Sequence, residues 1–309
     1  MIRPKISFVI PCYGSENTIE KVVADIFAVM AQRSYAFELI LVNDASKDRV
    51  WNKIERLTAK HKNIMGISLA KNFGQHAALM AGYARVSGDI VISLDDDGQH
   101  PPAEIFALID KLNEGYDVVF SAYAKKQHNI FRNIGSKLND YMAEILIGKP
   151  QHIQIYSYYA VRRFIINEIV KYRGPYPYIT GLLFRVTSNM ANVTIGHQKR
   201  AAGNSGYSFP KLLELWLNGF TAFSIKPLRI ASLIGLTLSG FSVFYIIYLV
   251  WEYFRDPQMV IGYTSIMAGI IFIGGITMSM LGLIGEYIGR IYISLNNAPQ
   301  YVVKTILNK

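Results

Sequence analysis

The chain has 309 residues, of which 51% are hydrophobic and 17% charged, and it carries a formal net charge of +10 at pH 7. The charged fraction is below the roughly 25% that is usual in soluble domains, so the composition excludes a disordered chain, a collagen and a coiled coil. It favours a protein that is partly embedded in a membrane. The single cysteine, Cys12, excludes an intrachain disulfide and favours a reducing, cytosol-facing catalytic part.

The positive charge is concentrated in the middle of the chain. Residues 1–117 carry 13 Lys and Arg against 15 Asp and Glu, a net charge of −2, and residues 230–309 have a net charge of +1. Residues 118–229 carry 15 against 4, a net charge of +11. A basic block of this kind is typical of proteins that bind nucleic acid, anionic lipid or a phosphorylated substrate, and composition alone does not choose among them.

Apolar, β-rich runs alternate with helical patterns in the first 121 residues. The runs predict strands over the ranges 6–10, 39–43, 64–69, 90–94 and 118–121. The segment 18–33, between the first two runs, is typical of a helix. This alternation predicts an α/β fold with a mainly parallel sheet, whose binding crevice lies at the carboxyl ends of the strands. We therefore expect the chemistry directly after each strand.

Three consecutive carboxylates, Asp95, Asp96 and Asp97, follow the fourth predicted strand. Adjacent carboxylates repel one another unless a cation neutralises them, and their hard oxygen atoms suit Mg²⁺ or Mn²⁺ shared with a diphosphate. A solvated acidic turn is the alternative interpretation. Asp44 follows the second predicted strand, where it either reads a base edge or ribose hydroxyl, or caps the helix that comes next.

Two amphipathic stripes, over residues 130–145 and 209–220, follow the predicted sheet at helical spacing. Such stripes are typical of helices packed on a protein core. Inside a basic block next to membrane spans, they are equally typical of helices that lie in the membrane interface. Both interpretations stay open at this point.

Two uncharged segments, 230–251 and 257–285, come next. At 22 and 29 residues, each is long enough as a helix to cross a hydrocarbon core of about 30 Å. Lys226 and Arg229 precede the first segment, and Arg290 follows the second. By the positive-inside rule, the sequence predicts a transmembrane hairpin with the catalytic part and both termini in the cytoplasm.

The motifs after the predicted strands resemble those of the family-2 glycosyltransferases. The matching segments are Pro11-x-Tyr13-x-x-Glu16, Val42-Asn-Asp44-x-Ser46-x-Asp48, Lys71-Asn-Phe-Gly74-x-x-Ala77-Ala78-x-x-Ala81-Gly82 and Leu94-Asp-Asp-Asp97-x-Gln99-x-Pro-Pro102. The later part resembles the polyprenyl-phosphate branch of that family, which includes bactoprenol glucosyltransferases and dolichol-phosphate mannose synthases. Its matching segments are His197-x-x-Arg200-x-x-Gly203-x-Ser205-x-Tyr207, Phe223-Ser-x-Lys-Pro-Leu-Arg229 and Leu283-Ile-Gly-Glu-Tyr-Ile-Gly-Arg290.

The resemblance implies a GT-A (Rossmann-like) sheet domain, interfacial amphipathic helices and a two-helix transmembrane hairpin. It assigns nucleotide-sugar binding to a set of residues at the strand ends: Pro11, Tyr13, Glu16, Asp44, Asp95, Asp96 and Gln99. Asp44 would contact the nucleobase, and Asp95 and Asp97 would hold Mg²⁺ or Mn²⁺ and the donor diphosphate. Catalysis would involve Asp97, Arg200 and Ser205, and the acceptor phosphate would meet Arg132, Arg200 and Ser205, where arginine forks suit phosphate geometry.

The chain departs from the family pattern in one catalytic segment. Many relatives place a carboxylate before a basic pair, whereas residues 153–163 of this chain contain none. A hydroxyl acceptor needs a general base because its pKa is far above neutral, but a polyprenyl phosphate already presents an anionic oxygen at pH 7. The loss is therefore compatible with activity on a phosphate acceptor, and we expect Tyr156 or Ser157 to occupy the place of the carboxylate.

These observations predict an inverting enzyme that moves one sugar from a nucleotide diphosphate sugar, with a UDP-sugar favoured, to undecaprenyl phosphate in a bacterial inner membrane. The resemblance also implies a homotetramer. We expect a nucleotide-sugar-binding core over 1–121, an acceptor-side region over 122–228, two transmembrane helices over 229–290 and a cytoplasmic tail over 291–309. The alternatives are a processive polysaccharide synthase, which the absent Gln-x-x-Arg-Trp segment disfavours, a non-catalytic membrane subunit that binds nucleotide or lipid, and, least favoured, a nucleic-acid-binding protein.

Overall fold

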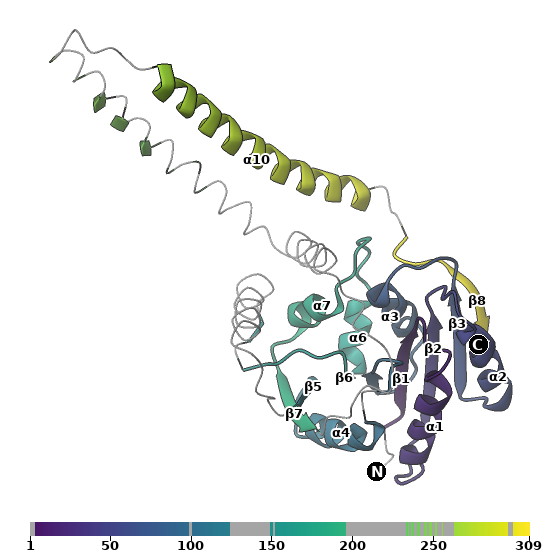
Figure 1. Cartoon of the computed structure of the whole chain (residues 1–309). Helices are drawn as coiled ribbons and strands as arrows, with labels where there is room; N and C mark the ends of the chain where they lie inside the picture. The colour runs from purple at the N-terminus through teal and green to yellow at the C-terminus, as the bar shows by residue number, and fades with distance from the viewer. Residues whose placement is uncertain are drawn as a thin grey trace. The chain divides into compact units, whose positions relative to one another are not determined.

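The computed structural model describes residues 4–98, 101–123, 149–150, 152–195, 263–295 and 299–309, together with isolated helical positions between 233 and 255. Contacts divide the chain into two units, Met1–Tyr207 with Asn297–Lys309, and Ser208–Asn296. The first unit holds the sheet, and the second holds the long helix α10 (Tyr263–Leu295) (Figure 1).

The described part of the first unit is built on one eight-stranded sheet in the order β7-β5-β6-β4-β1-β2-β3-β8. The strands are β1 (Ile6–Cys12), β2 (Phe37–Asn43), β3 (Ile64–Leu69), β4 (Ile90–Ser93), β5 (Val118–Tyr123), β6 (Tyr159–Arg162), β7 (Met190–Ile195) and β8 (Val303–Leu307). β1 pairs in parallel with β2 and β4, β2 with β3, and β5 with β7. β6 runs antiparallel to β4 and β5, and β8 runs antiparallel to β3.

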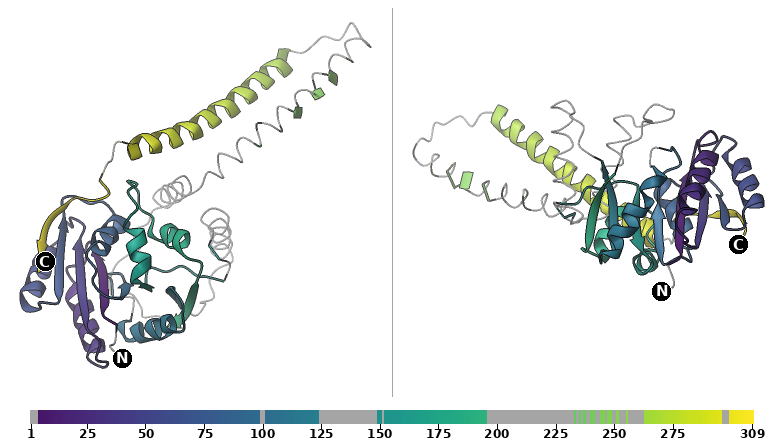
Figure 2. Two further views of the ribbon diagram at one scale, coloured as in Figure 1. Left: turned by 180° about the vertical axis from the view of Figure 1, so that it is seen from behind. Right: turned by 90° about the horizontal axis from the view of Figure 1, so that it is seen from below.

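This architecture confirms the predicted α/β fold with a mainly parallel sheet. β1 to β5 coincide with the five predicted strands to within two residues at either end. The sheet also extends beyond residue 121, because β6, β7 and β8 come from later parts of the chain. In particular, the predicted tail over 291–309 contains β8, which lies at the edge of the sheet beside β3 and ends near the C-terminus (Figure 2).

Helices cover both faces of the sheet. They are α1 (Ile19–Met30), α2 (Val50–Lys60), α3 (Gln75–Tyr83), α4 (Ile105–Asn113) after the 3₁₀ turn η1 (Pro102–Glu104), α6 (Arg163–Ile169) and α7 (Ile179–Val186). The buried side chains of α1, α2 and α4 join one core cluster with those of β1 and β2. α3 packs on the opposite face, where a Cβ atom at Gly82 would collide with Val9 Cγ1. Only glycine permits this close approach of helix to strand.

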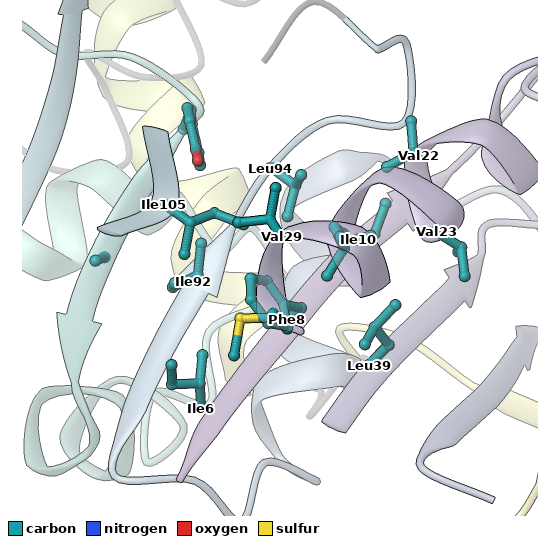
Figure 3. Close-up of a cluster of buried hydrophobic side chains, with 14 of the residues drawn as sticks. Ile6, Phe8, Ile10, Val22, Val23, Val29, Leu39, Ile92, Leu94 and Ile105 are labelled. Atoms are coloured by element: carbon teal, nitrogen blue, oxygen red, sulfur yellow. The ribbon is translucent and has the colours of Figure 1, made fainter. Parts of the chain in front are cut away.

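The core explains why β1 lies at the centre of the sheet. Ile6, Phe8 and Ile10 point toward α1 and meet Val22 and Val29, as Figure 3 shows. Every residue of β1 is buried, which is typical of a parallel strand covered by helices on both faces. The buried strand and its register with β2 and β4 bring the carboxyl ends of these strands to one edge of the sheet.

Helix α10 exposes apolar side chains, whereas the sheet buries them. Among the described residues it is the one helix that is long and apolar enough to cross a membrane, with a stretch of mean hydropathy 1.3 over Phe272–Gly289. Its apolar side chains are exposed, including Met278 at 71% and Leu295 at 74%. α10 contains most of the second predicted span, 257–285. Of the first predicted span, 230–251, only isolated helical positions are described, and the two amphipathic stripes lie outside the described residues.

Candidate active site

The carboxyl ends of the parallel strands β4, β1, β2 and β3 meet at one edge of the sheet. The loops that follow these strands carry the residues that the sequence singled out. Two residues on different loops, Gly14 after β1 and Ser46 after β2, are joined by a hydrogen bond of 2.8 Å from the Gly14 amide to Ser46 Oγ. The loops therefore form one connected surface at the sheet edge.

Glu16 strengthens the connection between the β1 and β2 loops. Its backbone amide donates to Asp48 Oδ2 at 2.9 Å, and its carboxylate Oε2 accepts from the Arg49 amide at 2.9 Å. Ser46 Oγ donates to Asp48 Oδ1 at 2.7 Å. The structure thus places Glu16 as a bridge between loops, while its contact with a nucleotide sugar stays a prediction.

Asp96 ties the β1 loop to the acidic turn after β4. Its Oδ2 accepts a hydrogen bond of 2.9 Å from the backbone amide of Tyr13, whose side chain is 52% exposed. Burial raises the pKa of Asp96 to about 6, and the neighbouring Asp95 carboxylate acts in the same direction, whereas the Tyr13 amide opposes the shift. The predicted residue Pro11 is buried within β1, opposite Val42, and precedes the loop that carries Tyr13.

Asp95 is held by two neutral donors from distant parts of the chain. Gln75 Nε2, in the first turn of α3, donates to Asp95 Oδ1 at 2.8 Å. Ser157 Oγ, two residues before β6, donates to Asp95 Oδ2 at 2.5 Å. This contact places Ser157 beside the acidic turn, whereas the expectation that Tyr156 or Ser157 takes the place of the missing carboxylate stays a prediction. Gln75 was missed, because it stands at an unassigned position inside the Lys71–Gly82 motif.

Asp97 completes the acidic turn. It is half-buried and precedes Gly98, whose φ of +71° is favoured by glycine. Among the described residues, no three His, Cys, Asp or Glu side chains are grouped so that they could hold a metal ion by themselves. Two aspartates on one turn therefore leave most coordination positions of a divalent cation to other oxygen atoms.

Asp44 is buried and accepts hydrogen bonds from the loop that leads into α3. It is 3% exposed, and its Oδ1 and Oδ2 accept hydrogen bonds of 2.8 Å from the backbone amides of Phe73 and Gly74. Burial raises the pKa of Asp44, and the two amides act in the opposite direction. The carboxylate thus holds the loop that precedes α3, whereas the capping interpretation of the sequence concerned the next helix along the chain, α2. Its contact with a nucleobase stays a prediction.

A buried group of hydroxyls lies under the acidic turn. Tyr83 Oη is 2.6 Å from Ser93 Oγ and 2.5 Å from Tyr159 Oη. Burial raises the pKa of Tyr159 to about 12, so the phenol is protonated at neutral pH. The group links α3 and β4 to β6, which begins two residues after Ser157.

Four of the predicted site residues lie outside the described residues: Gln99, Arg132, Arg200 and Ser205. Their roles in catalysis and in binding the acceptor phosphate stay predictions. The described site is therefore the donor side of the predicted centre.

Comparisons with known proteins agree with this architecture. The model of the family "Glycosyl transferase family 2" matches residues 7–170, and that of the "GtrB C-terminal hairpin" matches residues 226–291. Among solved structures, glucosyl-3-phosphoglycerate synthase from Mycobacterium tuberculosis, in complex with Mn²⁺, UDP and phosphoglyceric acid, superposes with a TM-score of 0.51 at 22% identity. The match covers 75% of this chain and 78% of that one, and it shows the shared GT-A fold.

Curated relatives match over nearly the full length. The undecaprenyl-phosphate 4-deoxy-4-formamido-L-arabinose transferase of Yersinia pestis (strain Pestoides F) is 34% identical over 311 residues, covering 98% of this chain and 94% of the relative. That of Yersinia enterocolitica is 32% identical over 309 residues, with the same coverage. With the acidic turn and the GT-A sheet, these matches lead to one conclusion: the chain belongs to glycosyl transferase family 2 and is a glycosyltransferase.

Proposed function

We propose that this protein transfers one sugar from a nucleotide diphosphate sugar to undecaprenyl phosphate, with inversion at the anomeric carbon. The observation that carries the proposal is the acidic turn Asp95–Asp97 at the carboxyl edge of a GT-A sheet, in a chain whose full-length relatives are named as undecaprenyl-phosphate transferases. A UDP-sugar is the favoured donor, and the solved structure with UDP supports this choice.

The donor would bind along the loops of β1, β2 and β4. The exposed ring of Tyr13 offers an apolar surface next to Asp96. In the sequence, Glu16 follows Tyr13 by three residues and Gln99 follows Asp96 by three. Asp95 is fixed in orientation by Gln75 and Ser157, so its carboxylate is held in one position before the donor arrives. Such preorganisation lowers the ordering cost of binding.

The carboxylates of the turn fit a divalent cation. Asp95 and Asp97 would hold Mg²⁺ or Mn²⁺ together with diphosphate oxygens and water, since hard oxygen ligands suit both ions. The Mn²⁺ in solved structures of the Mycobacterium tuberculosis glucosyl-3-phosphoglycerate synthase supports this donor set. When bound, the cation supplies neutralisation of the charge that develops on the departing nucleoside diphosphate.

The acceptor chemistry explains why the chain functions without a carboxylate in residues 153–163. An oxygen of undecaprenyl phosphate attacks the anomeric carbon as the bond to the nucleoside diphosphate breaks, and the phosphate is already ionised at pH 7. No proton has to be removed, so catalysis depends on positioning and charge stabilisation. We assign Arg132, Arg200 and Ser205 to the acceptor phosphate, in the block with a net charge of +11.

The membrane arrangement completes the proposal. We propose two transmembrane helices over 229–290, with the catalytic part and both termini on the cytoplasmic side of a bacterial inner membrane. The exposed apolar side chains of α10 and the match to the GtrB C-terminal hairpin support this topology. We keep a core over 1–121, an acceptor-side region over 122–228 and a tail over 291–309 as the functional division of the chain, and a homotetramer as its assembly.

Product formation tests the proposal. Purified protein in nanodiscs is incubated with Mg²⁺ or Mn²⁺, undecaprenyl phosphate and a panel of UDP-sugars headed by UDP-4-deoxy-4-formamido-L-arabinose, the sugar named for the relatives. Mass spectrometry should detect one undecaprenyl-phosphate sugar. If the protein binds nucleotide but no glycolipid forms with any donor, the alternative of a non-catalytic membrane subunit is correct instead.

A further inference from the structure

The C-terminal segment 299–309 completes the sheet after the chain has passed through the second unit. β8 pairs with β3 through the partners Ile67 with Ile306 and Ser68 with Thr305. The register shifts between Ser68 and Leu69, so the segment bends where β3 ends. Without β8, the described sheet would expose the unpaired amides and carbonyls of β3.

Two amide side chains fasten this segment at its ends. Gln300 Nε2 donates to the carbonyl oxygens of Tyr172 at 2.7 Å and Gly174 at 2.8 Å. At the other end, Asn308 Nδ2 lies 2.7 Å from the carbonyl of Thr58 and 3.0 Å from that of Ile64. Asn308 adopts a φ of +54°, a conformation that asparagine tolerates better than most residues. The side chains thus add fixed attachments to the strand pairing.

The segment also touches the loop that leads to the donor site. The backbone amide of Ala70 donates to the carbonyl of Val302 at 2.8 Å. Four residues farther along, the same loop is gripped by Asp44 through the Gly74 amide, and Gln75 next to it orients Asp95. One end of the 70–75 loop is therefore held by the C-terminal segment and the other by the core of the site.

We propose that the C-terminal segment 299–309 is a positioning element for donor binding, acting through the 70–75 loop that presents Gln75 to Asp95. The inference rests on the proposed function, because it assigns a role to the donor site. Holding the loop at Ala70 removes conformational freedom that would otherwise be lost when the nucleotide sugar binds. The segment contributes no group to the reacting atoms.

Full-length variants with altered attachments provide the first test. The double variant Gln300→Ala/Asn308→Ala removes both side-chain anchors, and Lys309→Ala is the matched control at the neighbouring exposed position. UDP affinity is measured by calorimetry in the presence of Mn²⁺, and KM is measured separately for donor and for undecaprenyl phosphate. We expect roughly a fivefold to tenfold loss of UDP affinity and an equal rise in donor KM, with acceptor KM unchanged.

A chain that ends at Pro299, combined with a synthetic peptide of residues 300–309, provides the second test. The peptide should restore UDP affinity in trans, because added strands bind through the same main-chain hydrogen bonds. If the truncated chain does not fold, the double variant decides alone. Unchanged UDP affinity and donor KM in the double variant, at a lowered melting temperature, would overturn the inference, whereas absent UDP binding in the unaltered protein would overturn the proposed function instead.

Discussion

The sheet edge and helix α10 differ in which side chains they bury and which they expose. At the sheet edge, a charged residue such as Asp44 is 3% exposed and accepts hydrogen bonds from two backbone amides, while the apolar residues of the adjoining strand β2, such as Leu41 and Val42, are buried. On α10, apolar side chains such as Ile273 and Met278 are more than half exposed. The first region is stabilised by excluding water from its core, and the second has the exposed apolar surface that the proposed transmembrane helix requires. Apolar side chains are thus buried in one region of the chain and exposed in the other.

The largest expected effect comes from the acidic turn. Asp97→Asn keeps the size of the side chain but removes a charge from the proposed cation site, so we expect turnover to fall by roughly 10²- to 10³-fold. The rate is measured by glycolipid formation at saturating donor and acceptor. Membrane insertion of α10 should be unchanged, since the two regions are governed by different solvents. Retention of most of the turnover would contradict the role of Asp97.

A charge on α10 tests whether its exposed face lies in lipid. Met278 is 71% exposed, so Met278→Arg would cost little stability if this helix faced water. In a hydrocarbon core, the same change is expected to cost about 3 kcal/mol of insertion free energy. The fraction inserted is measured by a glycosylation-mapping assay, with Met278→Leu as the control. Full insertion of the arginine variant would show that position 278 does not lie in the hydrocarbon core.

Glu38 offers a pH-dependent test of the water-soluble region. Its side chain is 16% exposed and accepts hydrogen bonds from Lys5, Ser7 and Ser87. Burial acts to raise the pKa of Glu38, but these donors outweigh it and lower the pKa to about 2. The carboxylate is therefore more acidic in the folded state than in the unfolded state, and its contribution is present above pH 4.5 and lost as the pH falls toward 2.

The magnitude follows from the shift. About 3 kcal/mol of the free energy of unfolding should disappear between pH 4.5 and 2 in the unaltered protein. Glu38→Gln should lose a similar amount at pH 7 and show a flatter acid limb, as measured by urea unfolding at several pH values. Glu55→Gln, at an exposed position on α2, is the matched control. An acid limb that is as steep in Glu38→Gln as in the unaltered protein would contradict this account.

The smallest expected effect comes from the buried hydroxyl group. Tyr83→Phe removes the contacts with Ser93 and Tyr159 and should cost about 1–2 kcal/mol of unfolding free energy. Tyr159, at the start of β6, contacts this group, and Ser157 just before β6 contacts Asp95. The variant should therefore also lower kcat modestly, while α10 inserts normally. Thermal unfolding and single-turnover rates check both effects. A lowered melting temperature with unaltered kcat would limit the hydroxyl group to a structural role.

The elements that could be predicted from sequence are those with a local pattern. β1 and β4 are short, mostly apolar runs, and the carboxyl end of β4 locates Asp95 and Asp97 from the order of residues alone. The contact between Ser157 and Asp95 depends on β6 lying beside β4, a pairing across about 70 residues that no local pattern encodes. Gln75 reaches Asp95 only because α3 begins at the same sheet edge.

The eighth strand was not predicted for a related reason. Its sequence, Val-Lys-Thr-Ile-Leu, has a short and weak alternation, and it follows a long apolar helix that dominates the hydropathy pattern. Pairing with β3 spans almost the whole chain, so the information lies in the fit between the two strands. Asp44 shows the same limit at shorter range: its residue type is typical of a helix cap, but the tertiary fold brings it to the amides of the loop before α3.

The late position of β8 also sets an order of events during synthesis. Ile67 of β3 leaves the ribosome 239 residues before its partner Ile306. At 5–20 residues per second, β3 waits roughly 12–48 s for this neighbour, while the apolar segments between them are being translated. The sheet therefore reaches its final form only after the proposed transmembrane segments have been synthesised, because its last strand follows them in the chain.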